Sequence, residues 1–175
     1  MMEQKRKRQH KFLVDAMVGR LTTWLRILDF DAVQVKESQR NKLLERSFLE
    51  NRTILTRETQ LASAHSFGLA LITTEHWQDQ IKELWKILKL KRIDKKRVFT
   101  RCTQCNHSVK KIAKSNIRKG KVPPRILETI NDFSQCPKCR KIFWAGSHVD
   151  NTIASLKEIG ILKNAKCEKA GGRKE

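Results

Sequence analysis

The sequence predicts an α/β protein in which a mainly parallel sheet with flanking helices is followed by a smaller module built on two cysteine pairs. Two observations carry this prediction. Short apolar runs alternate four times with segments whose apolar residues recur at helical spacing, which is typical of a parallel sheet covered by helices. Beyond residue 97 this alternation stops, and two CxxC pairs appear in a strongly basic segment.

The first half of the chain supplies the four strand-like runs, each followed by a helical segment. On the second helical segment, Leu43, Leu44, Phe48 and Leu49 are expected to form the apolar side. Crossovers in such a sheet are right-handed, and the carboxyl ends of parallel strands lie at one edge, where active sites are found. The expected strands are 12–15, 31–35, 53–56 and 69–73, and the expected helices are 18–28, 40–50, 61–67 and 76–90.

The cysteines of the second half have the spacing of a zinc site. CTQC at 102–105 and CPKC at 136–139 each let a tight turn aim two thiolates at one ion, and two such turns complete a tetrahedron. A redox CxxC motif would be expected in one copy beside a strand–helix unit, whereas this chain has two copies in a basic module. His107 is the alternative fourth ligand, but we expect it to be exposed, and Cys167 to be a free thiol. The predicted ligands of a structural Zn²⁺ are Cys102, Cys105, Cys136 and Cys139.

These features divide the chain into five expected parts. Helical spacing resumes after the second cysteine pair and stops at Gly160, which is a good helix terminator. A basic linker with a helical piece at 123–130 separates the two cysteine pairs. The expected parts are a basic arm at 1–11, an α/β domain at 12–97, a zinc ribbon with a basic insertion at 98–148, a C-terminal helix at 149–162 and a basic tail at 163–175.

The chain is strongly basic, with a net charge of +20 on 175 residues. Residues 101–141 hold eleven lysines and arginines against two acids. Counterion release favours contact between such a surface and phosphates, so nucleic acid is the expected partner. The alternative is a solvated lysine surface, although cationic excess is a poor means of solubility. Without a long apolar stretch or a secretory segment, we expect an intracellular, cytoplasmic protein, with KRKR at 5–8 as an alternative nuclear address.

Three acids lie at the ends of expected strands. Asp15 ends the first strand, Glu58 follows the third and Glu75 follows the fourth. Converging carboxylates repel one another unless a cation neutralises them, and Mg²⁺ or Mn²⁺ suits such oxygen ligands. A metal held there can support phosphoryl displacement. The alternatives are that Asp15 caps a helix and that the two glutamates favour helix N-termini electrostatically.

The order of the motifs resembles one protein family. FLVDAMVGRLTTWLRIL, ILTRETQLA, CTQC, VPPRILE, CPKC and FWAGSH follow one another over residues 12–155. Together they resemble the Mut-seven C-terminal RNase domain, a PIN-like nuclease fold fused to a zinc ribbon. The resemblance implies a metal-dependent ribonuclease site with Asp15, Glu58 and Glu75 in its acidic positions. Further positions that match the family are Arg20, Trp24, Arg26, Arg57, Trp144, Gly146, Ser147 and His148.

Two departures from the family bear on catalysis. The residues before Leu43 include no acid from Ser38 to Lys42, where the family carries acids, and Glu58 replaces an aspartate. Because Mg²⁺ geometry is strict, both changes disfavour metal binding, and Arg40 or Lys42 would replace the charge of the metal.

We therefore expect an RNA-binding protein of weakened or lost nuclease activity, associated with structured RNA or a ribonucleoprotein such as the ribosome. The alternative is an active metal-dependent endoribonuclease, and DNA binding through the ribbon is a third reading. The residues expected to contact RNA are Arg20, Arg26, Arg57, Lys110, Lys111, Arg118, Lys119, Lys121, Arg125 and His148.

Overall fold

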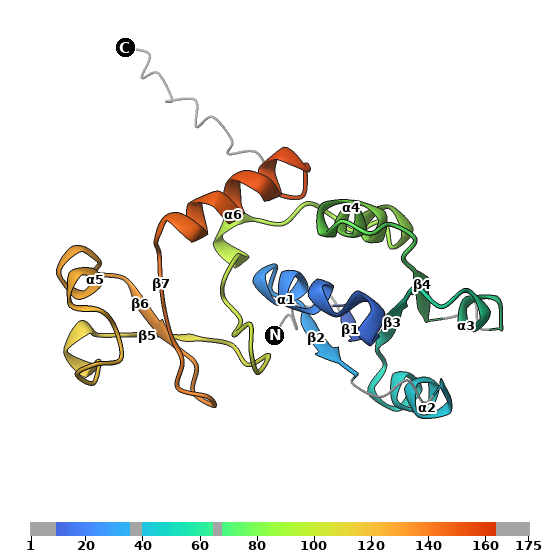
Figure 1. Cartoon of the computed structure of the whole chain (residues 1–175), viewed down its shortest axis with the longest axis horizontal. Coiled ribbons are helices and arrows are strands. Elements are labelled where there is room, and N and C mark those ends of the chain that lie inside the picture. Colours follow the sequence, from blue (N-terminus) through green and yellow to red (C-terminus); the bar gives the residue numbers. More distant parts are fainter. Residues whose placement is uncertain (1–9, 36–39, 65–67, 164–175) are drawn as a thin grey trace, which may run out of the picture.

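A four-stranded parallel sheet forms the centre of the first half of the chain (Figure 1). The structure, a computed structural model, describes residues 10–35, 40–64 and 68–163. The strand order is β2-β1-β3-β4, and each neighbouring pair is parallel, which confirms the predicted fold class. The strands are β1 (Lys11–Val14), β2 (Asp31–Gln34), β3 (Thr53–Thr56) and β4 (Leu69–Leu71).

Helices cover both faces of this sheet because successive strand residues point to opposite sides. Phe12 and Val14 of β1 belong to a buried cluster shared with α1 and α4, whereas Leu13 packs with residues of α2 and α3. The sheet therefore lies between two helical layers. The elements of these layers are the 3₁₀ turn η1 (Ala16–Val18), α1 (Gly19–Ile27), α2 (Arg40–Glu50), α3 (Thr59–Ala64) and α4 (Trp77–Ile87).

The apolar side predicted for α2 is wrong at two positions. Leu43 is buried and Leu44 is half-buried, but Phe48 is 86% exposed and Leu49 is 73% exposed. Leu43 and Ser47 are four residues apart and thus share the helix face turned toward the sheet, which directs Phe48 and Leu49 away from it.

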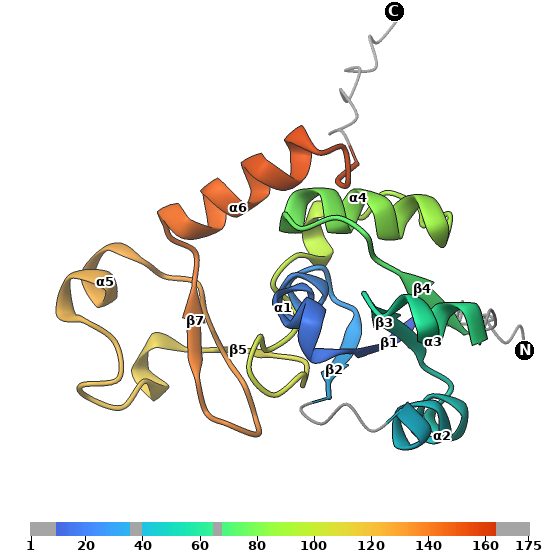
Figure 2. The same ribbon diagram turned by 45° about the vertical axis from the view of Figure 1, so that its right-hand side comes forward.

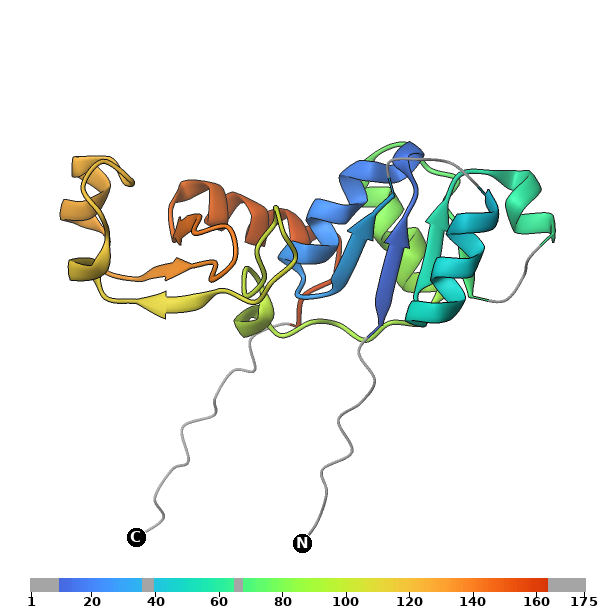
Figure 3. The same ribbon diagram turned by 90° about the horizontal axis from the view of Figure 1, so that it is seen from below.

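The second lobe is a small antiparallel sheet, seen beside the first lobe in Figure 3. Its strand order is β5-β6-β7, and the β6–β7 connection carries the second cysteine pair. The basic insertion between β5 and β6 contains the 3₁₀ turn η3 (Lys114–Asn116) and α5 (Pro124–Thr129). The strands are β5 (Lys110–Ile112), β6 (Phe133–Gln135) and β7 (Ile142–Trp144).

The last helix, α6 (Ser147–Glu158), runs from the ribbon back to α4 of the first lobe (Figure 2). Leu156 of α6 and the following Ile161 are buried in the α/β core. The Ile93 N–H donates to the Ile161 carbonyl at 2.9 Å. This bond ties the residues that follow α6 to the segment between α4 and the 3₁₀ turn η2 (Lys95–Arg97). Gly160 adopts a φ of 74° and ends the helix, as predicted. The ribbon is thus attached to the first lobe at both of its ends.

Within the described ranges, no helix combines the length and the apolar character that crossing a membrane requires.

Candidate metal centre and nucleic-acid interface

The four predicted cysteines come together at one point. Their sulfur atoms all lie within 4.8 Å of one another, and none forms a disulfide. The sulfurs of Cys102 and Cys139 are 3.6 Å apart, and those of Cys105 and Cys136 are 3.2 Å apart. A tetrahedron with Zn–S distances of about 2.3 Å has edges of about 3.8 Å, so the cluster fits one zinc ion with small adjustments. It can hold the ion structurally, because four thiolates leave no coordination position open.

Two equivalent backbone turns position these sulfurs. In the first turn, the Cys102 N–H donates to the His107 carbonyl at 2.8 Å, and the Cys136 N–H donates to the Lys141 carbonyl at 3.0 Å in the second. Asn106 and Arg140, each directly after the second cysteine of a pair, have φ angles of 67° and 62°. Both pairs therefore use the same left-handed residue to close the turn.

The four sulfurs form the cluster without a histidine ligand. His107 is exposed, and its ring hydrogen-bonds to the Cys105 carbonyl at 2.8 Å, so it lies outside the sulfur cluster, as expected. Burial raises the pKa of the Cys102 thiol to about 12. Metal binding at this residue would therefore release a proton, because the thiolate is the ligand. Cys167 lies outside the described residues.

The first cysteine turn is docked on the α/β domain through Arg26. This guanidinium donates to the carbonyls of Thr103 and Gln104 at 2.8 and 2.9 Å, and to the Ala32 carbonyl at 2.9 Å. Arg26 was a predicted RNA contact, but its hydrogen bonds here join α1, the edge of β2 and the cysteine turn. The sequence carried no signal for this role, because the acceptors are backbone carbonyls more than 70 residues away.

Asp31 at the start of β2 forms the second part of this junction. It accepts from Arg52 Nη1 at 2.8 Å and from Asn106 Nδ2 at 2.6 Å, and Asn106 Oδ1 accepts from the Ala32 N–H at 3.2 Å. Burial alone would raise the pKa of Asp31, but the hydrogen bonds from Arg52 and Asn106 outweigh it and hold the pKa below its usual value. Asp31 is thus a stable carboxylate that links the sheet to the ribbon.

Asp15 lies at the carboxyl end of β1, where it was predicted, and both of its oxygens have partners. Asp15 Oδ2 accepts from the Thr56 hydroxyl at 2.6 Å, and Asp15 Oδ1 accepts from the Met17 N–H at 3.3 Å, which caps η1. The Thr56 hydroxyl in turn accepts from the Glu58 N–H at 3.0 Å. The capping alternative for Asp15 is therefore realised, and Thr56 connects it to the start of α3.

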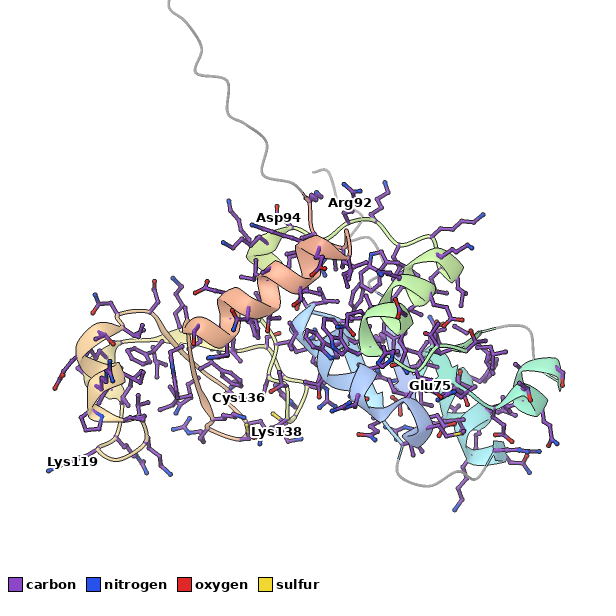
Figure 4. The ribbon with its side chains drawn as sticks, turned by 45° about the horizontal axis from the view of Figure 1, so that its top comes forward. Glu75, Arg92, Asp94, Lys119, Cys136 and Lys138 are labelled. Carbon is purple, nitrogen blue, oxygen red and sulfur yellow. The ribbon has the colours of Figure 1, made fainter. Side chains whose placement is uncertain are left out.

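The two glutamates each form an ion pair with an arginine. Glu58 pairs with Arg40 at the start of α2, and Glu75 pairs with Arg57 at 3.5 Å. Figure 4 shows Glu75 in the α/β lobe, well apart from Cys136. In the part of the chain that the structure describes, the four cysteines are the one group of three or more metal-ligand residues whose ligand atoms lie together. The three acids lie near one edge of the sheet without forming a metal-ligand cluster.

Comparison with known protein families agrees with this architecture. A family model described as the Mut7-C RNAse domain matches residues 10–156, most of the chain. The chain belongs to this family. The match confirms the resemblance seen in the motifs and indicates a nuclease-like, RNA-related function for the Mut7-C domain described here. No curated protein and no solved structure matched the chain.

The loop that carries Glu75 in this Mut7-C domain is held by two side chains that the sequence analysis missed. Glu83 of α4 accepts from the backbone N–H groups of Thr73 and Thr74 and from both threonine hydroxyls, at 2.7–3.2 Å. Buried Gln80 donates to the carbonyls of Thr74 and Glu75 at 3.1 and 3.2 Å. These contacts depend on how α4 packs beside the loop, and no motif in the sequence marks them.

The ribbon of the Mut7-C domain carries the predicted RNA contacts on its surface. Lys111 pairs with Asp132 at 3.3 Å, and among the described residues no other lysine of the ribbon pairs with an acid. Lys119 lies at the end of the ribbon far from the α/β lobe, whereas Cys136 and Lys138 lie near the junction (Figure 4). Arg20 on α1 and His148 on α6 are also exposed. The predicted ribbon cations, all exposed, are Lys110, Lys111, Arg118, Lys119, Lys121 and Arg125.

Proposed function

We propose that this Mut7-C protein binds structured RNA, either ribosomal RNA or the RNA of another ribonucleoprotein, and that its nuclease activity is weakened or lost. The observation that carries the loss of nuclease activity is the pairing of Glu58 with Arg40, which lies in the segment before Leu43 that departs from the family. The Arg40 guanidinium stands where a nuclease of this family would concentrate negative charge around a metal ion.

A divalent metal would have to displace these partners. Asp15 would give up the bond from Thr56 or its cap on η1, and each glutamate would exchange an arginine for the ion. Mg²⁺ also demands near-octahedral geometry, which the longer arm of Glu58 meets less readily than an aspartate does. When bound, Mg²⁺ or Mn²⁺ would supply phosphoryl-oxygen polarisation. The residues here favour a site neutralised by arginine, which leaves RNA binding as the main role.

Affinity for RNA comes from the exposed cations of the ribbon. A-form RNA is recognised mainly through its shape, its phosphates and its 2′-hydroxyls, so a dense basic surface suffices without base readout. The ribbon insertion offers such a surface on a fold fixed by zinc and docked through Arg26 and Asp31.

The first test is an RNA-cleavage assay. Wild-type protein incubated with a structured RNA and Mn²⁺ or Mg²⁺ is expected to bind the RNA without cutting it, and Asp15→Asn is expected to behave in the same way. The same preparations are assayed for RNA affinity, so that a silent nuclease is not confused with an unfolded protein. Metal-dependent cleavage that disappears in Asp15→Asn would instead establish the alternative function.

That alternative, an active metal-dependent endoribonuclease using Asp15, Glu58 and Glu75, is favoured by one observation. Glu75 is 78% exposed and its pair with Arg57 is long, at 3.5 Å, so this carboxylate can turn toward an incoming ion at little cost. The cleavage assay with wild type and Asp15→Asn separates the two functions.

The second test is the salt dependence of RNA affinity. Lys119→Ala, at the outer end of the ribbon, is expected to weaken binding and to reduce the slope of log K against log salt by roughly 0.7–0.9, which corresponds to one lost phosphate contact. Lys86→Ala, at another exposed lysine, on α4 of the other lobe, serves as the matched control and should change neither quantity. Equal slopes in all three proteins would contradict phosphate binding by the ribbon.

A further inference from the structure

A cavity of about 460 Å³ lies between the ribbon and α6. Its walls come from the segment after η2, the first cysteine turn, the β6–β7 hairpin and the first turns of α6. The residues that give it chemical character are Phe99, Asp132, Lys141, Phe143, Trp144 and His148. Aromatic faces, a carboxylate acceptor and a cation thus share one hollow next to the basic ribbon.

Two of these rings meet over a glycine of the FWAGSH motif. A Cβ atom placed on Gly146 would lie 3.4 Å from His148 Nδ1 and 3.6 Å from Trp144 Nε1. Among the described residues, none hydrogen-bonds to the Trp144 indole N–H or to the His148 ring. Both groups are therefore able to bind a ligand in the cavity.

A third ring is held in place by a strained backbone. Phe99 has a φ of 63°, which is unusual for a bulky residue, and its N–H donates to the Ile27 carbonyl at the end of α1 at 2.8 Å. Strain of this kind is kept where surrounding structure fixes a functional residue. The wall formed by Phe99 is thus anchored to the α/β domain, whereas the facing wall belongs to the ribbon.

The charged, aromatic and polar groups around the cavity indicate the class of ligand that it can bind. Lys141 is exposed, and its ammonium group lies 5.7 Å from the centre of the Phe143 ring, which places a cation beside an aromatic face. Aromatic side chains stack on unpaired bases while neighbouring cations bind the phosphates. Asp132 and Ser134 add hydrogen-bonding groups for the edge of a base.

We propose that this cavity binds one unpaired nucleobase of an RNA whose flanking phosphates lie on the ribbon. The inference rests on the proposed RNA binding and extends it, because it adds a site for single-stranded or looped-out nucleotides to a surface that otherwise recognises phosphates. It also gives a role to Trp144 and His148, which neither the zinc site nor the acidic site uses.

The test compares an RNA hairpin that carries one looped-out nucleotide with a hairpin strand of the same length that is abasic at that position, both bound to the full zinc-loaded chain. Trp144→Ala is expected to lower affinity for the RNA by roughly 5- to 150-fold, the range for loss of one stacked base, and to leave affinity for the abasic strand unchanged. Trp144→Phe should restore most of the affinity, because it keeps an aromatic face. Lys119→Ala should weaken both strands alike.

The outcomes distinguish a failure of the proposed RNA binding from a failure of the proposed nucleobase site. If wild-type protein binds neither strand, the proposed RNA function fails. If it binds RNA but Trp144→Ala matches wild type, or weakens both strands equally, the base site is wrong while phosphate binding stands. His148→Ala, at an exposed position of α6, repeats the comparison if Trp144→Ala loses its zinc or its helical signal. A selective loss for the base-containing strand in this variant supports the site, and no such loss contradicts it.

Discussion

Cys136→Ser is expected to abolish stoichiometric zinc binding, unfold the ribbon and remove most of the affinity for RNA. Between residues 98 and 148, all of which the structure describes, the buried side chains are Cys102, Val122, Phe133 and Cys136. Half of this small core consists of predicted metal ligands, so the ribbon has little apolar burial with which to fold alone. Structural zinc contributes about 10–16 kcal/mol of apparent binding free energy, and removal of a buried ligand forfeits much of it.

The matched control is Cys167→Ser, because this cysteine is the fifth in the chain and lies outside the predicted ligand set. Zinc content by mass spectrometry and RNA affinity should be unchanged in this variant. Full zinc occupancy in Cys136→Ser would contradict the ligand assignment.

The second large effect is expected at the junction of the two lobes. Asp31→Ala removes the acceptor shared by Arg52 and Asn106 and leaves Arg52, whose side chain is 10% exposed, with Glu50 as its remaining acidic partner. Both side chains are half-buried, and a hydrogen bond to a charged group contributes about 1.5–3 kcal/mol, so the free energy of unfolding should fall by about 2 kcal/mol. Chemical denaturation of the zinc-loaded protein measures this change.

Acid should reduce the difference in free energy of unfolding between wild type and Asp31→Ala. The pKa of Asp31 is lowered in the folded state, so its stabilisation is complete above the unfolded pKa of about 4 and is lost as pH falls through the folded pKa. Asp132→Ala is the matched control, because its pair with Lys111 is exposed and is worth at most about 1 kcal/mol. Equal stability of Asp31→Ala and Asp132→Ala would show that the junction is not held by this network.

Local patterns were enough to predict the strands of the parallel sheet and the cysteines that cluster at one point. TILT at 53–56 is an apolar run of strand length between polar segments, and it forms β3 at those residues. The two CxxC pairs specify their own turns, because each needs only a few residues to aim its sulfurs. The strand and the cysteine turns each depend on a short stretch of chain, so the local sequence is sufficient to predict them.

The arrangement of the side chains at longer range was not predictable in the same way. Arg26 was expected to contact phosphate, but its acceptors are carbonyls of the cysteine turn, and a carbonyl has no signature in the sequence. The role of Glu83 also depends on tertiary packing, because α4 must first lie beside the β4 loop. The pairing of Arg40 with Glu58 was foreseen only as a possible replacement of metal charge, from the lack of an acid before Leu43.

The most direct test of this account measures RNA affinity of the purified protein before and after removal of zinc, at about the physiological ionic strength of 0.15 M. We expect one zinc ion per chain, loss of RNA binding when a chelator removes it, and recovery when zinc is returned. A protein that is isolated without zinc, or that binds RNA equally well after the metal is stripped, would contradict the claim that a zinc-bound ribbon presents the cations that hold RNA.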